Sequence, residues 1–329
     1  MPTIQDRHVG HIGYGLMGLT WRADPPSEFE CFDVMNTALS CGANFWNGGE
    51  FYGSPEANSL QLLNKYFTAF PDKADSVFLS IKGGLTPTTR LPDSSEAGIR
   101  RSVDECIRVL DGKKSIDLFQ CARTDPNTPI EQVVEVLAEL VREGKIKSIG
   151  LSEVRAETIR RAQKVYPITA VEVELSLWTT DILHNDIAAT CAELGIPIIA
   201  YAPLSRGALA DGFPKKNSAL PAHRRDFPKF RDEALSRNMR LTEEVEKWAK
   251  QRGCSKSQMA IGWVRGMSAR GGLGTIIPIP GAEKKEWVRE NCEDVVLTDK
   301  EMKTLEEALK RHQIVGERYA GGLAQLANG

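Results

Sequence analysis

The chain has 329 residues, of which 41% are hydrophobic and 26% are charged, and its formal net charge is −2. This balance is typical of a folded globular protein, and the near-neutral charge argues against nucleic acid or an anionic membrane as the main partner. No apolar run approaches the length of a membrane span, and residues 1–8 contain no apolar signal core.

Strand-like and helix-like segments alternate along the whole chain. The predicted strands cover residues 9–16, 43–46, 77–81, 116–120, 148–151, 170–175, 197–201 and 275–279. The predicted helices cover residues 29–40, 56–70, 95–110, 129–142, 156–165, 185–194, 241–252, 284–291 and 299–311. Alternation of this kind indicates an α/β protein with a parallel sheet. Eight strand–helix units in roughly 300 residues predict a closed (β/α)8 TIM barrel, followed by an extra C-terminal helix.

We therefore expect a single barrel domain over residues 1–329, with a long polar loop near 203–236 and a flexible tail near 313–329. Active sites of such barrels lie at the carboxyl ends of the strands. The residues that fall at these ends are Tyr52, Lys82, Ser152, Leu175 and Tyr201.

A glycine motif near the start suggests a different fold. Residues 13–18 match the G-x-G-x-x-G pattern of Rossmann proteins, and Asp33 stands at the spacing of their ribose-binding acid. In that pattern the last glycine lies inside a helix that continues from it. Here Pro25 and Pro26 follow closely, and paired prolines cannot continue a helix. We interpret the glycines as a tight first strand and the loop after it.

Tyr52 and Lys82 form the most informative pair. Tyr52 lies in the glycine-rich segment 44–53, and Lys82 ends the apolar run 76–82. If the two strands are neighbours in a barrel, the side chains lie side by side. A neighbouring ammonium stabilises a phenolate and lowers the tyrosine pKa from about 10, and the pair becomes a proton donor for a carbonyl that accepts hydride. Taken singly, Tyr52 is better explained as an ordinary turn residue and Lys82 as a solvated charge. Taken together with the motifs below, these explanations become unlikely.

Two segments carry a family resemblance. Residues 15–21 (Gly-Leu-Met-Gly-Leu-Thr-Trp) and 45–53 (Phe-Trp-Asn-Gly-Gly-Glu-Phe-Tyr-Gly) resemble the aldo-keto reductase family, and within it the pyridoxal reductase branch. The resemblance implies a barrel that binds a nicotinamide dinucleotide in an extended form without a Rossmann unit. It also implies that Tyr52 is the acid and Lys82 its lysine. The implied reaction is the NADPH-dependent reduction of an aldehyde to an alcohol, with pyridoxal as substrate and pyridoxine as product.

Two catalytic positions depart from the family pattern. Asn47 stands where the family has an aspartate, and Ala122 stands where it has a histidine. Asn47 can still accept a hydrogen bond from Lys82, but it supplies no charge. Arg123 can supply charge in place of the histidine, unless strand alternation points it away. Glu50 is either a replacement carboxylate or, the favoured interpretation, a solvated loop acid.

The resemblance also implies the cofactor contacts. Ser152 and Glu172 match positions that touch the nicotinamide carboxamide, although Glu153 and Glu172 replace the usual Asn and Gln. Tyr201 matches the tyrosine that stacks on nicotinamide. The residues implied at the pyrophosphate are Pro203, Leu204, Ser205, Arg206 and Gly207, and those at the adenosine end are Gly281, Lys284, Glu290 and Asn291. Lys284 is either a ligand of a 2′-phosphate or an exposed helix charge, and Trp287 replaces a frequent arginine, which weakens the preference for NADPH.

The candidate substrate pocket consists of residues on the loops above the barrel. They are Trp21, Phe51, Ala122, Arg123 and Trp178. Aromatic side chains there suit a flat pyridine ring, and each is explained equally well by loop packing. Two other functions stay open: a broad-specificity carbonyl reductase, and a cofactor-binding regulatory subunit of the potassium-channel β-subunit type. Asn47 and Ala122 favour the regulatory subunit, whereas Tyr52 and Lys82 together favour the enzyme.

The cysteines and histidines indicate neither a disulfide framework nor a metal site. The seven cysteines include no Cys-x-x-Cys, which is typical of reduced thiols in a cytoplasmic or nuclear compartment. The five histidines show no metal-ligand spacing. We expect a small-molecule aldehyde as the partner, and a monomer or weak homo-oligomer.

Overall fold

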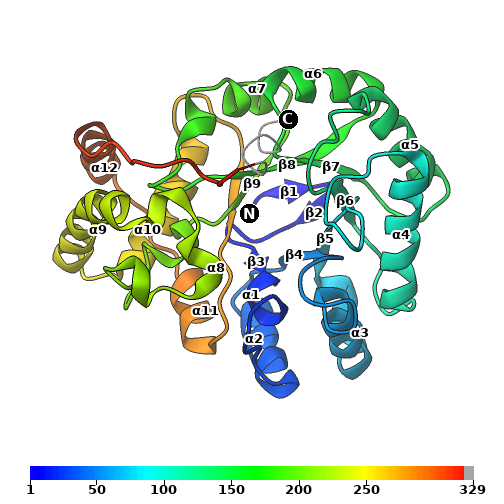
Figure 1. The fold of residues 1–329 in the computed structure, drawn as a ribbon, viewed down its shortest axis with the longest axis horizontal. Helices are drawn as coiled ribbons and strands as arrows, with labels where there is room; N and C mark the ends of the chain where they lie inside the picture. The colour runs from blue at the N-terminus through cyan, green and yellow to red at the C-terminus, as the bar shows by residue number, and fades with distance from the viewer. Residues whose placement is uncertain (322–329) are drawn as a thin grey trace.

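Eight parallel strands form the centre of the computed structural model, which describes residues 1–321 (Figure 1). The strands are β3 (Tyr14–Gly15), β4 (Phe45–Gly49), β5 (Phe78–Gly83), β6 (Leu118–Cys121), β7 (Ile149–Ser152), β8 (Ile168–Glu174), β9 (Ile198–Tyr201) and β10 (Ile276–Ile279). They are hydrogen-bonded in chain order from β3 to β10. Gly13 N donates to Pro278 O at 2.9 Å and Gly15 N donates to Pro280 O at 3.2 Å, so the first and last strands meet. The predicted (β/α)8 barrel is confirmed.

Helices surround the strands (Figure 1). The longer ones are α2 (Glu28–Ser40), α3 (Ser59–Ala69), α4 (Glu96–Leu110), α5 (Ile130–Arg142), α6 (Ala156–Val165), α7 (Ile187–Glu193), α9 (Asp232–Arg252), α10 (Lys256–Gly266), α11 (Lys285–Cys292) and α12 (Asp299–Arg311). Short helical turns are α1 (Met17–Thr20), α8 (Ala222–Arg225), η1 (Pro71–Ser76), η2 (Asp181–Leu183), η3 (Ser205–Gly207), η4 (Asn217–Ala219), η5 (Pro228–Phe230) and η6 (Met267–Ala269). None of the helices within residues 1–321 is long and apolar enough to cross a membrane.

Three elements differ from the sequence-based prediction. Helix α10 was not predicted, because almost every residue of it is buried and no polar face reveals a helical period. Its start was visible in the capping box between Ser255 and Gln258. Helix α9 begins at Asp232, inside the predicted loop 203–236. An N-terminal hairpin of β1 (Thr3–Ile4) and β2 (Arg7–His8) was also missed, because two-residue strands carry too little periodicity to detect.

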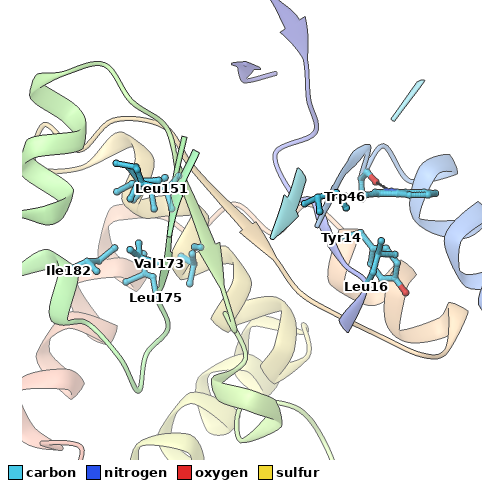
Figure 2. Packing of buried hydrophobic residues seen from close by; sticks show 14 of the residues in the cluster. Tyr14, Leu16, Trp46, Leu151, Val173, Leu175 and Ile182 are labelled. Atoms are coloured by element: carbon cyan, nitrogen blue, oxygen red, sulfur yellow. Dashed lines mark hydrogen bonds between the residues drawn. The ribbon is translucent and has the colours of Figure 1, made fainter. Parts of the chain in front are cut away.

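The hydrophobic core lies in two places. Inside the barrel, Ile4 and Val9 from the hairpin region pack with residues near the amino ends of the strands, among them Phe45 and Phe78, whose rings stack at 5.4 Å. This plug fills one end of the barrel and leaves the carboxyl ends of the strands for a site. The larger cluster lies between strands and helices. Figure 2 shows parts of it, with Tyr14, Leu16 and Trp46 on one side of the barrel and Leu151, Val173, Leu175 and Ile182 on another.

The glycine motif serves barrel closure. A Cβ atom at Gly13 would lie 2.7 Å from Phe45 O and 2.9 Å from Ile279 Cγ2, and one at Gly15 would lie 3.1 Å from Ile279 O. Only glycine lets the first strand approach its neighbours this closely. Asp33, the apparent ribose acid, instead pairs with Lys285 at 3.0 Å. The Rossmann interpretation is therefore excluded by the structure, as the prolines had indicated.

We expect Gly13→Ala to lower the thermal unfolding temperature, because the added Cβ would force backbone apart at the closure and cost about 1–3 kcal/mol. Gly18→Ala, at the other end of the same motif, is the matched control. A Cβ there meets no atom within 4 Å, and Gly18 lies in helix α1. We expect this control to be neutral or to stabilise by about 0.4–1 kcal/mol. Equal unfolding temperatures for the two variants would contradict the closure argument.

Candidate active site

Tyr52 and Lys82 lie together at the carboxyl ends of β4 and β5. These strands pair in parallel, with Gly49 opposite Lys82. Tyr52 follows on the loop after β4, and its backbone N–H donates to Gly49 O at 3.2 Å. Lys82 Nζ donates to Tyr52 OH at 3.1 Å, and both residues are about 95% buried, with exposed fractions of 5% and 6%. The structure therefore brings the two predicted residues into direct contact.

Burial has the largest influence on the pKa of the Tyr52 hydroxyl. Burial raises the pKa of Tyr52 above its usual value, and the Lys82 ammonium lowers it by less than burial raises it. The expectation of a lowered pKa was wrong in its net direction, because desolvation of a phenolate outweighs one neighbouring cation here. Desolvation also opposes the charge of Lys82, but Glu172 and Tyr52 raise the pKa of Lys82 above its usual value. At neutral pH the pair is thus a phenol beside an ammonium.

The carboxylate beside Lys82 comes from β8. Glu172 is fully buried, and its Oε1 forms an ion pair with Lys82 Nζ. Its Oε2 accepts hydrogen bonds from Asn47 Nδ2 at 2.8 Å and from Gln120 Nε2. Asn47 had been expected to accept a hydrogen bond from Lys82, but its amide donates to Glu172 instead. The resemblance implies a place for Glu172 at the cofactor carboxamide, but the structure places its carboxylate against Lys82.

Two members of this buried cluster, Ser80 and Gln120, were not predicted as site residues from the sequence. Ser80 Oγ accepts from Gln120 Nε2 at 3.3 Å and from Asn47 Nδ2 at 3.5 Å. A signal was present, because Ser80 and Lys82 are alternate residues of one strand and therefore face the same side. A polar residue two positions before the lysine, in an otherwise apolar strand, indicates a polar barrel interior.

The segment after α12 returns to the barrel mouth (Figure 1). Arg318 NH2 donates to Glu153 Oε2 at 2.6 Å and Arg318 NH1 donates to Glu153 Oε1 at 3.1 Å. Tyr319 OH lies 2.8 Å from Tyr201 OH, which donates to Glu153 at 2.9 Å. Residues 313–321 of the tail expected to be flexible are thus held by specific contacts, and residues 322–329 lie outside the described residues. Glu153 receives its counter-charge from this segment.

Arg123 points into the same region. Its NH2 donates to Tyr319 OH at 3.1 Å, and its charge lies close enough to Tyr52 to lower the pKa of that phenol. Strand alternation had allowed Arg123 to point away, but it follows the end of β6 and is free to turn inward. Ala122 before it is buried, with its carbonyl bound by Arg123 NH1.

Aromatic residues form one wall beside the acid. The ring of Trp21 lies 5.8 Å from that of Tyr52 and 5.9 Å from that of Phe51, and Trp21 is 42% exposed. Trp178 does not belong to this wall. It is 2% exposed, and its indole N–H donates to Thr242 Oγ1 at 3.1 Å, which anchors its loop to α9. The indole packs inward, and the assignment of Trp178 to the substrate pocket stays a prediction.

Glu50 is neither a replacement carboxylate nor a solvated acid. It accepts hydrogen bonds from Arg101 at 2.7 Å and from Ser102, both on α4. Its backbone N–H donates to Lys82 O at 2.9 Å. Glu50 therefore fastens the loop that carries Tyr52 to the surrounding helix layer.

Two residues expected at the nicotinamide end, Tyr201 and Ser152, lie at the carboxyl ends of their strands. Tyr201 ends β9, and Lys82 Nζ lies 5.0 Å from its ring centroid. Ser152 ends β7, and its buried hydroxyl finds no hydrogen-bond partner among the described residues. A buried hydroxyl without a partner is costly unless a ligand supplies one. These positions fit a bound nicotinamide carboxamide.

The residues expected along the rest of the dinucleotide lie on the next two loops. Residues 203–207 follow β9, where Ser205 Oγ donates to Ser176 and Arg206 pairs with Glu174 at 2.9 Å. Gly281 follows β10, and Lys284 is exposed at the N-cap of α11, with its Nζ 4.7 Å from the Trp287 ring centroid. Of the other two, Glu290 accepts from Ser255 Oγ, and Asn291 is buried. No cluster of His, Cys, Asp or Glu suited to a metal is found in residues 1–321.

Comparison with known proteins agrees with this arrangement. The model of the Aldo/keto reductase family matches residues 11–310. The chain belongs to the aldo/keto reductase family. It is 40% identical over 328 residues to the probable pyridoxal reductase 2 of Schizosaccharomyces pombe, covering 97% of each chain. It is 37% identical over 337 residues to the putative pyridoxal reductase of Saccharomyces cerevisiae, covering 95% of this chain and 96% of that protein.

Solved structures support the same family. A glycerol dehydrogenase of Gluconobacter oxydans matches with a TM-score of 0.80 at 25% identity, covering 95% of this chain and 96% of that one. This aldo/keto reductase is therefore an NAD(P)H-dependent oxidoreductase, and its substrate is a small carbonyl compound. The resemblance inferred from the motifs around Tyr52 is confirmed.

We expect Arg318→Met to destabilise the fold by about 3–5 kcal/mol, because it leaves the buried Glu153 carboxylate without its cation. The two side chains are 9% and 1% exposed. Arg160→Met is the matched control, since its pair with Glu193 is 42% and 59% exposed and an exposed ion pair contributes little to stability. Thermal unfolding measures both variants, and similar losses would contradict the argument.

The same variant has a predicted pH dependence. Burial opposes ionisation of Glu153, but Arg318 holds its pKa below the usual value. In the wild type, ionised Glu153 therefore contributes its full share of the folding stability above the pKa of an unfolded glutamate, about 4.3. That stability is lost as pH falls through the lower pKa of the folded protein. Removing Arg318 takes away the largest influence that lowers the pKa of Glu153 and leaves those of Arg123 and the Tyr201 hydroxyl, so the ionised carboxylate contributes less stability in the variant than in the wild type. The difference between the two proteins should shrink from pH 7 toward pH 4, and a constant difference would contradict this assignment.

Proposed function

We propose that this aldo/keto reductase uses NADPH to reduce an aldehyde to an alcohol, with pyridoxal as substrate and Tyr52 as the proton donor. The observation that carries the proposal is the buried contact of Lys82 Nζ with Tyr52 OH, 3.1 Å long, at the carboxyl ends of the strands. The names of the Schizosaccharomyces and Saccharomyces relatives support pyridoxal over other aldehydes.

The residues divide the chemistry among them. The nicotinamide, when bound, supplies hydride to the carbonyl carbon. Tyr52 gives its phenolic proton to the carbonyl oxygen as negative charge develops there. Lys82 stabilises the phenolate that remains, because its ammonium lies within hydrogen-bond distance. Trp21 and Phe51 present aromatic surface to a flat substrate ring, and Arg123 places a positive charge near the oxygen in place of the histidine of relatives.

The alternative functions differ in what they require. A regulatory subunit needs the dinucleotide but no acid, and it gives no reason for a buried phenol beside a buried ammonium. A broad-specificity carbonyl reductase needs the same acid and differs in substrate range alone.

We also propose a cytoplasmic location, to which the seven free cysteines are suited, and a monomer or weak homo-oligomer.

We expect Tyr52→Phe to lower kcat by about 10²–10⁴-fold, because it removes the proton donor and keeps the ring. Nucleotide affinity should stay close to wild type, since the hydroxyl contacts Lys82 and not the expected dinucleotide positions. Turnover is followed by NADPH absorbance, and affinity by protein fluorescence. Near-normal turnover in this variant would remove Tyr52 from the mechanism.

We expect NADPH to bind more tightly than NADH, and Lys284→Ala to reduce that ratio, because an ammonium attracts a 2′-phosphate as a point charge. Lys284 is exposed and lies over Trp287, so no buried partner restrains it. Dissociation constants of both nucleotides are measured for wild type, Lys284→Ala and the exposed control Lys300→Ala. If the NADPH/NADH ratio is the same in all three, Lys284 does not read the phosphate.

The absent histidine leads to a prediction about the substrate. Ala122 lacks a donor, and the 3-hydroxyl of pyridoxal, ortho to its aldehyde, can assist the carbonyl oxygen instead. Pyridine-4-carboxaldehyde lacks this hydroxyl, so its kcat should be lower than that of pyridoxal, because a donor used in the transition state affects kcat. Ala122→His should narrow the gap or block the larger ring. Equal kcat values for the two aldehydes in wild type would exclude assistance by the substrate. Pyridoxal itself would be excluded as the substrate if the enzyme oxidised NADPH rapidly with unrelated aldehydes but not with pyridoxal.

A further inference from the structure

The buried cluster around Lys82 contains one carboxylate, and it lies on the opposite side of the barrel interior from the position where a family member is expected to carry it. Position 47 on β4 holds an amide, and position 172 on β8 holds the acid. We propose that Glu172 is the positioning residue for the reaction: it keeps Lys82 charged and aimed at Tyr52, and Asn47 and Glu172 have exchanged an acid and an amide. This inference rests on the Tyr52–Lys82 chemistry proposed above, but not on pyridoxal as substrate.

The contacts of Glu172 assign it to Lys82. Oε1 pairs with Lys82 Nζ, while Asn47 and Gln120 both donate to Oε2. Oε1 thus faces the Lys82 ammonium as an ion pair, Oε2 accepts the two amide hydrogen bonds, and the side chain is fully buried. A carboxylate has no proton to donate, so Glu172 cannot replace a glutamine as donor to the oxygen of a carboxamide. Asn47 keeps a role as a neutral donor that orients the acid.

Charge balance explains why the acid cannot simply be lost. Lys82 is buried, and an isolated buried ammonium releases its proton because desolvation disfavours the charged form. The other charged or titratable groups that face it are the phenols of Tyr52 and Tyr201, together with the Arg123 cation, which acts on Tyr52. None of these supplies negative charge at neutral pH. Glu172 is therefore the group that balances Lys82, and moving the acid from β4 to β8 keeps the cluster neutral.

The exchange predicts a specific pattern of rescue. Glu172→Gln leaves Lys82 unbalanced, so kcat should fall by about 10²-fold, with a smaller change in KM for the aldehyde. The alkaline limb of the kcat profile should move to lower pH, because Lys82 loses its proton more easily. Asn47→Asp alone places two acids beside one ammonium and should also lower kcat. The double variant Asn47→Asp/Glu172→Gln restores one acid and one amide, and should recover kcat to within about tenfold of wild type.

The experiment measures kcat, KM and the pH profile of the four proteins with any aldehyde that the wild type reduces. Ser80→Ala is the matched control, because it removes a neutral hydroxyl from the same cluster and should leave the alkaline limb in place. Thermal unfolding and nucleotide binding establish that each variant is folded. The proposal is overturned if Glu172→Gln keeps kcat within about twofold of wild type, or if the folded double variant is no better than Glu172→Gln. Loss of the proposed function is a different result: it appears as normal turnover in Tyr52→Phe.

Discussion

The active site depends on one buried ion pair, between Lys82 on β5 and Glu172 on β8. The barrel interior offers little water to a charge, so the ammonium persists only because a carboxylate contacts it there. That ammonium is in turn the cation nearest to the Tyr52 hydroxyl, at 3.1 Å. The Tyr52 phenol, the Lys82 ammonium and the Glu172 carboxylate are therefore one electrostatic unit that spans the barrel.

The rest of the barrel serves to hold this unit in place. Apolar residues fill one end of the barrel, and they come from the N-terminal hairpin region and the amino ends of the strands. The polar residues lie at the other end, where the strands have their carboxyl ends. Glu50 ties the loop of Tyr52 to α4, and close approach of β3 to β10 at the glycines closes the sheet. A misplaced strand would separate Lys82 from Glu172, since each comes from a different one.

Two acids in this site, Glu172 and Glu153, stand where the family resemblance implies neutral amides, and each forms an ion pair with a cation. Glu172 pairs with Lys82, which the chemistry already required. Glu153 pairs with Arg318, which lies far along the chain, beyond the last helix. The second pair brings Tyr319 against Tyr201, so the C-terminal segment becomes part of the wall beside the acid.

The sequence by itself determined the barrel, the place of the site and the Tyr52–Lys82 pair, because strand and helix periodicity and the spacing of the glycine-rich motifs are local properties. It also indicated that the glycine motif was not a Rossmann fingerprint, since the prolines stand next to it. Only the tertiary structure decided the partner of Lys82, the burial of Trp178 and the docking of Arg318. Glu172 and Arg318 are separated from their partners by long stretches of chain, and no local pattern states which buried charges meet. The net direction of the Tyr52 pKa was decided there too, because desolvation depends on the whole surrounding fold.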